Sequence, residues 1–276
     1  MKIAAVQMVS TPNVDRNLET ARRLIARAAA DGATLVVLPE YFCFMGKADR
    51  DKLAIAEAPG EGPIQRMLAE SAHENEVWLI GGTLPLTIDT GASATAGAID
   101  RVMNANLVFS PRGDLAARYD KMHLFAYDNG RERYDESRTL QAGRAPVAFD
   151  ADGLHVGLSV CYDLRFPELY RALARPPCDL VSVPSAFTYT TGAAHWQVLL
   201  RARAIENQCY VVAAAQGGTH ENGRRTFGHS LVVDPWGEVV ACRADEGEGV
   251  VVAEVARERI ADVRRQLPAL EHRLAL

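Results

Sequence analysis

The sequence predicts an α/β protein, because strand and helix patterns alternate along most of the chain. Short apolar runs bounded by turn residues alternate with segments whose apolar positions recur at helical spacing. Two such alternating regions flank a centre that has the pattern of β-hairpins. The 276 residues suffice for a core that folds unaided, and no linker or repeat divides them, so we expect one domain spanning residues 1–276.

Composition and charge argue against several classes of protein. Lys and Arg number 30 against 35 Asp and Glu, and the net charge of -5 argues against a nucleic-acid partner, which needs a basic surface. No apolar run approaches the roughly 20 residues of a membrane-spanning helix, so we expect no membrane contact. With no signal peptide and five cysteines, the sequence predicts a cytoplasmic protein whose thiols are reduced.

The first third predicts buried strands separated by amphipathic helices. Its strands are nearly continuous apolar runs, as expected when both faces of a sheet are covered. Asn13 is placed to cap the first helix and Pro63 to begin the second. In order, the predicted elements are a strand at 2–9, a helix at 14–30, a strand at 34–38, a helix at 64–73 and a strand at 77–84.

The remainder predicts hairpins and then a second alternating region. Turns rich in proline, glycine and aspartate separate the paired strands. The predicted hairpin strands are 102–109 with 115–119, 147–149 with 155–160, and a last pair around the turn at 234–237. The other predicted elements are helices at 166–174, 194–206 and 257–266, and strands at 180–183, 210–215 and 250–255. Two stretches without periodicity, 125–146 and 216–229, are long enough that we expect functional loops there.

Three reactive side chains each come just after a hydrophobic strand: Glu40, Lys121 and Cys161. In α/β sheets, sites gather outside the carboxyl ends of the strands, so we expect the three to meet. Each residue alone is typical of an ordinary solvated charge or a packed thiol. Together they form a chemically complete set, and the combination predicts a site.

The set suits nucleophilic catalysis that needs neither a metal nor another cofactor. A nearby ammonium and the N-terminus of the following helix are expected to favour the thiolate of Cys161. The carboxylate of Glu40 can accept the thiol proton and later activate water. Lys121 can stabilise the oxyanion formed when sulfur attacks a carbonyl or nitrile carbon.

The segments LPEY (38–41), YDKMHL (119–124) and VCYDLRFPELYR (160–171) resemble the three signature blocks of the nitrilase superfamily of carbon-nitrogen hydrolases. The blocks occur in the family's order, and the resemblance runs from Lys2 to about Leu267. It implies a four-layer α-β-β-α sandwich of two mixed sheets, forming a single carbon-nitrogen hydrolase domain. It also implies that Glu40 is the general base, Lys121 the oxyanion-stabilising residue and Cys161 the nucleophile that forms an acyl-thioester. Glu136 matches a second glutamate that holds Lys121 and helps to orient the substrate.

The segment 184–241 is similar to the branch of amidases that hydrolyse deaminated glutathione. The implied reaction cleaves the amide bond that joins 2-oxoglutarate to cysteinylglycine. Because this small-molecule amide is anionic, we expect a cationic anchor, with Arg165 as first choice and Arg131 or Arg133 behind it. Phe187 and Thr188 resemble a pocket-lining segment.

Alternative functions stay open. An ω-amidase would release ammonia from 2-oxoglutaramate by the same chemistry. A non-catalytic ligand-binding protein on this fold is disfavoured by the intact set of three residues, and a redox sensor lacks a resolving cysteine nearby in sequence. His220 and His229 have no cysteine or carboxylate at metal-ligand spacing. We expect a homodimer or higher homo-oligomer, and the resemblance suggests that the helix at 194–206 meets the partner.

Three further positions receive structural interpretations. Cys43 lies three residues past Glu40, yet a packed thiol is the better interpretation. His123 follows Lys121 by two residues and is as compatible with a structural role as with polarising a site group. On the helix at 194–206, the side chains expected to pack inward are Trp196, Leu199 and Leu200.

Overall fold

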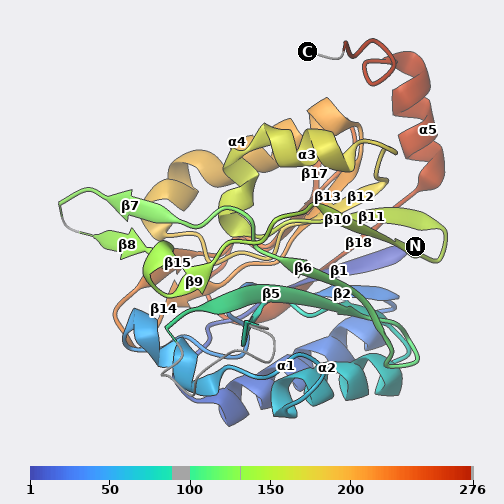
Figure 1. Cartoon of the computed structure of the whole chain (residues 1–276). Helices are drawn as coiled ribbons and strands as arrows, with labels where there is room; N and C mark the ends of the chain where they lie inside the picture. Colours follow the sequence, from blue (N-terminus) through green and yellow to red (C-terminus); the bar gives the residue numbers. More distant parts are fainter. Residues whose placement is uncertain (89–99, 131, 275–276) are drawn as a thin grey trace.

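Two mixed β-sheets pack face to face between outer helices, giving the four-layer α-β-β-α sandwich that was predicted (Figure 1). The computed structural model describes residues 1–88, 100–130 and 132–274. Within these ranges no helix is both long and apolar enough to cross a membrane.

The first sheet contains the N-terminal strands and, at its edge, the last strand of the chain. Within the described residues it has eight strands in the order β18-β1-β2-β3-β5-β4, with β6 and β9 also paired to β5. β1, β2 and β3 are parallel, whereas β18 runs antiparallel to β1. Its strands are β1 (Lys2–Gln7), β2 (Leu35–Val37), β3 (Trp78–Ile80), β4 (Leu84–Leu86), β5 (Val102–Phe109), β6 (Leu115–Asp120), β9 (Leu140–Gln141) and β18 (Gly249–Glu254).

The second sheet is built from the second half of the chain. In the described part of the molecule it has six strands in the order β10-β11-β12-β13-β16-β17, with a parallel centre of β11, β12 and β13. Its strands are β10 (Val147–Ala151), β11 (Leu154–Leu158), β12 (Leu180–Ser182), β13 (Tyr210–Ala213), β16 (Leu231–Val233) and β17 (Val239–Cys242).

Helices cover the outer faces of both sheets. The helices α1 (Val14–Ala30) and α2 (Pro63–Glu74) lie on the first sheet, and α3 (Pro167–Leu173) and α4 (Tyr189–Asn207) on the second (Figure 1). Asn13 caps α1 as predicted, its side chain accepting the Arg16 N–H at 2.9 Å. The last helix, α5 (Arg257–Gln266), packs Ile260 and Val263 inward.

The apolar core is divided by the first sheet, and β1 shows why. Ile3 and Ala5 point into the cluster shared with the second sheet, whereas Ala4 and Val6 point into the cluster beneath α1 and α2. Successive strand residues face opposite sides of a sheet, so a strand covered on both faces needs an unbroken apolar run.

The structure differs from the predicted elements in several places. The predicted strand 77–84 is divided into β3 and β4, because the intervening Gly82 takes a positive φ of 61°. The helix predicted at 194–206 begins five residues earlier, where Gly192 lies against Phe227, a tertiary contact with no local signal. The two predicted loops contain short elements: β7 (Ala126–Asp128), β8 (Arg133–Asp135) and the 3₁₀ helix η3 (Glu136–Arg138) in the first, and β14 (Gly217–Thr219) and β15 (Arg225–Phe227) in the second.

Candidate active site

Glu40 lies three residues beyond β2 and is 1% exposed. One carboxylate oxygen accepts hydrogen bonds from Asn104 Nδ2 at 3.0 Å and Lys121 Nζ at 2.9 Å. The other accepts the Ala186 N–H at 3.0 Å. A buried carboxylate needs such partners, and three donors fix its orientation.

Lys121 directly follows β6, and its side chain is fully buried between two carboxylates. Its Nζ lies 2.9 Å from Glu40 Oε1 and 2.7 Å from Glu136 Oε2. Burial alone lowers the pKa of Lys121, but Glu136 and Glu40 outweigh it and raise the pKa well above its usual value. Lys121 therefore stays an ammonium at every physiological pH.

Glu136 is the first residue of η3, and its carboxylate contacts the Lys121 ammonium on the side opposite Glu40. Its carboxylate also accepts the Tyr41 hydroxyl at 2.8 Å and the Phe125 N–H at 2.7 Å. Burial raises the pKa of Glu136, but the Lys121 charge and hydrogen bond exceed that effect and lower it. The predicted neighbourhood of Glu136 and Lys121 is therefore present.

Cys161 is the first residue of the 3₁₀ helix η4 (Cys161–Arg165). It lies three residues beyond the end of β11 (Leu154–Leu158). It is 7% exposed and has a φ of +48°, the left-handed region that costs a non-glycine residue roughly 1 kcal/mol or more. Its N–H donates to Pro184 O at 2.9 Å. The strained turn holds the sulfur at the end of the strand.

The expected thiolate of Cys161 is not what this environment favours. Burial raises the pKa of the Cys161 thiol well above its usual value, and the charge of Glu40 raises it further, with Lys121 only partly opposing. The helix expected to follow the thiol also begins later than expected: η4 intervenes, and α3 starts six residues beyond Cys161, at Pro167. This environment therefore favours the protonated thiol of Cys161.

Asp163 was not singled out from the sequence, yet it joins the Lys121 and Cys161 segments. It is fully buried and accepts the Tyr119 hydroxyl at 2.7 Å and the Val160 N–H at 2.8 Å. It also bonds the N–H and Nδ1 of His123, at 3.0 and 2.7 Å. Its position two residues after the cysteine was the available signal. His123 is thus held by Asp163 and stacks on Phe166, consistent with a structural role.

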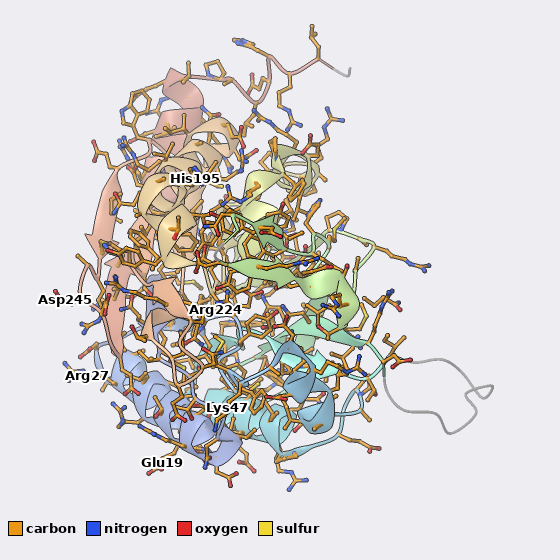
Figure 2. All side chains as sticks on the ribbon, turned by 90° about the vertical axis from the view of Figure 1, so that its left-hand side faces the viewer. Glu19, Arg27, Lys47, His195, Arg224 and Asp245 are labelled. Atoms are coloured by element: carbon orange, nitrogen blue, oxygen red, sulfur yellow. The ribbon has the colours of Figure 1, made fainter. Side chains whose placement is uncertain are left out.

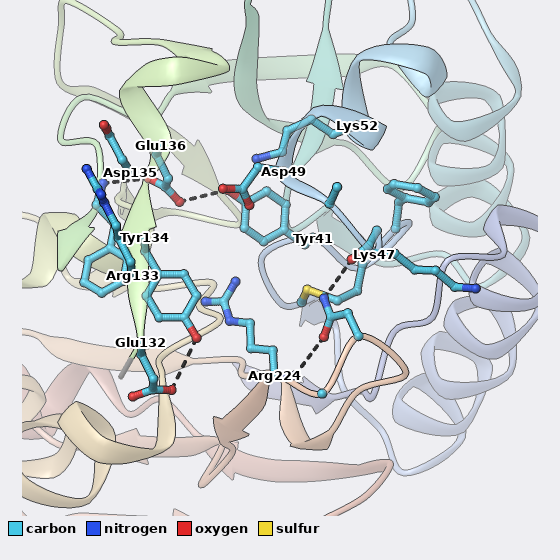
Figure 3. Close-up of a pocket in the computed structure, with 17 residues that line it drawn as sticks. Tyr41, Lys47, Asp49, Lys52, Glu132, Arg133, Tyr134, Asp135, Glu136 and Arg224 are labelled. Atoms are coloured by element: carbon cyan, nitrogen blue, oxygen red, sulfur yellow. Dashed lines mark hydrogen bonds between the residues drawn. The ribbon is translucent and has the colours of Figure 1, made fainter. Parts of the chain in front are cut away.

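Two hollows adjoin these residues. A small one, of about 10 Å³, lies directly at Cys161; its walls are Phe125, Tyr162, Arg165, Ala186, Phe187, Thr188 and Thr191. A cavity of about 440 Å³ lies on the Glu136 side and shares Phe125 with the first (Figure 3). Its other lining residues are Tyr41, Phe44–Asp49, Lys52, Glu132–Asp135 and Asn222–Arg224.

The structure brings some predicted binding residues together and separates others. Arg165, Phe187 and Thr188 line the hollow at Cys161, and the Arg165 guanidinium lies 5.4 Å from the centre of the Phe187 ring. Arg133 lines the larger cavity, with an exposed side chain 3.7 Å from Asp128. Arg131 lies outside the described residues.

The other singled-out residues take structural positions. Cys43 is 1% exposed, and its thiol lies 3.8 Å from Thr83 O, consistent with a packed thiol. His220 bonds Ser10 O and Thr226, and burial lowers its pKa to about 4. The ring of His229 stacks on Phe227.

Arg224 is a basic residue of the larger cavity that the sequence patterns did not reveal. It comes from β14–β15, far along the chain from the three blocks. Figure 2, seen from the side where β7 and β8 project in Figure 1, places Arg224 near the centre of this face, with Lys47 below it and His195 above. No local pattern distinguishes Arg224 from its neighbour Arg225.

The model of one protein family matches almost the entire chain: the carbon-nitrogen hydrolase model covers residues 2–265. The chain belongs to the carbon-nitrogen hydrolase family. The relative from Synechocystis, named deaminated glutathione amidase, is 43% identical over 274 residues, which cover 98% of this chain and 97% of that protein.

Solved structures support this family assignment. Yeast Nit3, described as a member of branch 10 of the nitrilase superfamily, has a TM-score of 0.86 and 32% identity, with 97% of this chain and 94% of that chain covered. The C. elegans NitFhit protein has a TM-score of 0.85 and 38% identity, with 99% of this chain but 64% of that chain covered. An amidase from Nesterenkonia, with a TM-score of 0.78, 26% identity and coverage of 97% of this chain and 98% of its own, is described with acrylamide added at its active-site cysteine.

Proposed function

We propose that this carbon-nitrogen hydrolase cleaves the amide bond of a 2-oxo-acid amide, deaminated glutathione, with Cys161 as nucleophile, Glu40 as general base and Lys121 as oxyanion-stabilising residue. The observation that carries the proposal is the buried contact of Lys121 with both Glu40 and Glu136. The Cys161 thiol is close enough for the Glu40 charge to raise its pKa. A nucleophile, a base and a fixed cation then face one reacting carbon.

In the first step, the Cys161 sulfur attacks the amide carbonyl carbon while its proton passes to Glu40. The carbonyl π electrons move to oxygen, and the Lys121 ammonium stabilises the resulting charge. Because the pKa of Lys121 is raised, it serves as a fixed charge and does not give up its own proton. Glu136 and Tyr41 hold this arrangement through their hydrogen bonds.

In the second step, the C–N bond breaks and Glu40 returns the proton to the leaving nitrogen. The acyl group stays on sulfur as a thioester. Glu40 then takes a proton from water, whose oxygen attacks the thioester carbon, and the sulfur leaves and regains the proton. The products are a carboxylic acid and an amine.

The acyl half of the substrate is assigned to the hollow at Cys161, where Arg165 supplies the positive charge for the 2-oxo carboxylate. The hollow of about 10 Å³ is smaller than a five-carbon acyl group, so its aromatic wall must shift when substrate binds. The name of the 43% identical Synechocystis relative supports this substrate choice.

The test of the nucleophile is the Cys161→Ala variant. We expect kcat/KM for deaminated glutathione to fall at least about 1000-fold, because no other group can form the thioester. The control is Cys242→Ala, which removes an exposed thiol and should keep wild-type activity. Mass spectrometry should also find the acyl adduct on Cys161 of the wild type. Turnover by Cys161→Ala at the wild-type rate would refute the assignment.

The competing ω-amidase function is decided by a comparison of kcat/KM for deaminated glutathione and 2-oxoglutaramate. Both amides give the same acyl-enzyme and differ only in the leaving group. We expect deaminated glutathione to be the better substrate; a clear preference for 2-oxoglutaramate would favour ω-amidase.

We also propose that residues 1–276 form one domain and that the protein is a cytoplasmic homodimer or higher homo-oligomer. Free thiols at all the cysteines, each within the described residues, suit a reducing compartment. Support for the dimer comes from α4, where Val198 is 67% and Ile205 46% exposed. Ile205 lies beside the turn carrying the half-exposed Trp236, since a Cβ on Gly237 would approach Ile205 to 2.6 Å. Light scattering during gel filtration tests the oligomeric state.

A further inference from the structure

The larger cavity adjoins the candidate site on its Glu136 side. Glu136, which holds Lys121, forms part of its wall. Phe125 lines both this cavity and the hollow at Cys161, so the two spaces adjoin. If the acyl half occupies the hollow at Cys161, as proposed above, the larger cavity is the adjoining space for the amine half.

The cavity is far larger than ammonia requires. Its volume of about 440 Å³ lies in the range typical of sites for small organic ligands. A dipeptide, about 7 Å long when extended, is a suitable occupant. The walls are mainly polar and charged, which favours an occupant with its own charge.

Arg224 is placed to bind a negative charge in this cavity. Its Nη2 donates to Ala186 O at 2.6 Å, and the guanidinium stacks 5.0 Å from the centre of the Tyr134 ring. Its Nε is buried without a hydrogen-bond partner, and among the described residues no carboxylate pairs with it. Figure 3 shows the guanidinium reaching into the cavity beside Tyr134.

Arg224 is also tied directly to the reacting centre. The Ala186 residue whose carbonyl it binds donates its own N–H to Glu40 at 3.0 Å. A single residue thus separates the cation from the general base. A ligand that binds Arg224 is therefore linked through Ala186 to Glu40.

Two acidic groups of the cavity, Glu132 and Asp135, have hydrogen-bond partners of their own. Glu132 accepts hydrogen bonds from Tyr134 and Thr190, at 3.4 and 3.3 Å, and Asp135 accepts one from Ser137 at 2.6 Å. The Lys52 ammonium lies 5.2 Å from the centre of the Tyr41 ring. Burial lowers the pKa of Lys52, and the charges of Glu136 and Asp49 partly oppose that effect. Among the described lining residues, Arg224 is the cation with a buried N–H that lacks a hydrogen-bond partner, which makes it the candidate for a ligand carboxylate.

We propose that the larger cavity is the leaving-group subsite, that it takes a dipeptide amine, and that Arg224 binds the carboxylate at the far end of that dipeptide. This inference rests on the proposed function, since it assumes that the amide carbon lies at Cys161. Arg224 then determines specificity: it favours a peptide leaving group with a free carboxylate over the same group without it. Arginine suits this role because its planar fork matches a carboxylate.

The experiment compares deaminated glutathione with its C-terminal amide, in which glycinamide replaces glycine. For the wild type, we expect kcat/KM to be roughly 10- to 100-fold higher for the acid, the range expected for a hydrogen-bonded charge pair. In Arg224→Met, which keeps an apolar stem against Tyr134, this ratio should fall close to one. Arg224→Lys should restore part of it.

The matched control is Arg225→Met, which removes the same charge from the next residue. Arg225 pairs with Glu246 at 2.6 Å and lies outside the cavity, so its variant should keep the wild-type ratio. Using a ratio within each variant cancels general losses of folding or activity. If Arg224→Met does not fold, the wild-type ratio and Arg224→Lys still test the inference.

The possible failures are distinguishable. A wild-type ratio near one, or a full wild-type ratio in Arg224→Met, overturns the assignment of Arg224 while hydrolysis itself continues. Absence of hydrolysis of both compounds by the wild type overturns the proposed function, and with it the premise of the subsite.

Discussion

The protonation of Cys161 is the residue-scale feature on which the proposed chemistry turns. Desolvation and the Glu40 carboxylate raise the pKa of the thiol, and Lys121 opposes them only in part because two carboxylates already surround it. A thiol with a raised pKa is inert until its proton is removed. In the proposed mechanism, the carboxylate that disfavours the thiolate at rest is also the group that generates it during attack.

A pH-dependent experiment tests this coupling through Glu40→Gln. Removing the negative charge next to sulfur stabilises the thiolate, so the pKa of Cys161 should fall. Amide hydrolysis should also fall, by roughly 100-fold or more, because the base is lost. The measurement is alkylation of Cys161 by iodoacetamide between pH 6 and 10, followed by mass spectrometry. An alkylation pKa equal to or above that of the wild type would contradict the coupling.

At the scale of elements, two glycines position the segments that contain Glu40 and Lys121. A Cβ on Gly82 would lie 2.1 Å from Pro39 O, and one on Gly143 would lie 2.0 Å from Asp120 O. Each of these carbonyls immediately precedes a site residue. This close approach of backbone to backbone is possible only for glycine. It therefore fixes the positions of Glu40 after β2 and Lys121 after β6.

We expect Gly82→Ala to lower both stability and activity. Its φ of +61° strains an alanine, and the clash with Pro39 must displace the segment carrying Glu40. A shift of about 1 Å at a catalytic group can cost roughly 100-fold in rate. Urea unfolding and kcat/KM for deaminated glutathione are the measurements.

Gly60→Ala is the matched control for this substitution. Gly60 has a φ of +84° but no atom within 4 Å of an added Cβ. It should therefore lose about 1 kcal/mol of stability from backbone strain and keep its activity. Equal behaviour of the two variants in both measurements would show that the Pro39 contact is unimportant.

At the scale of the whole molecule, the two halves of the chain share one core. β18 pairs with β1 along its full length, from Lys2 with Glu254 to Gln7 with Gly249. The next element, α5, packs on the second sheet, where Arg264 donates to Cys178 O. The last 30 residues or so therefore join both sheets, which argues against separate folding of the halves.

We expect a single cooperative unfolding transition, as one shared core requires. The double variant Trp78→Phe/Trp236→Phe leaves Trp196, buried on α4, as the fluorescent probe of the second sheet. Circular dichroism reports both sheets at once. Midpoints in urea should coincide for the two signals, and a clear separation would mean that the sheets unfold independently.

Local patterns were sufficient for most of the secondary structure and for choosing the candidate site residues. The strand at 102–109 and the helices at 14–30 and 257–266 match β5, α1 and α5 at both ends, because apolar periodicity and caps are written in adjacent residues. Glu40, Lys121 and Cys161 stood out because each follows a strand and because each lies in a family block.

The tertiary structure alone decided what depends on contacts between distant segments. The early start of α4, the bonds of Asp163 and Asn104 and the place of Arg224 all involve partners far away in sequence. The protonation of Cys161 belongs to the same group: sequence chemistry suggested a thiolate, but desolvation and the position of Glu40 reverse that expectation. The physical reason is that burial and Coulomb interactions depend on distance in space, which residue order does not specify.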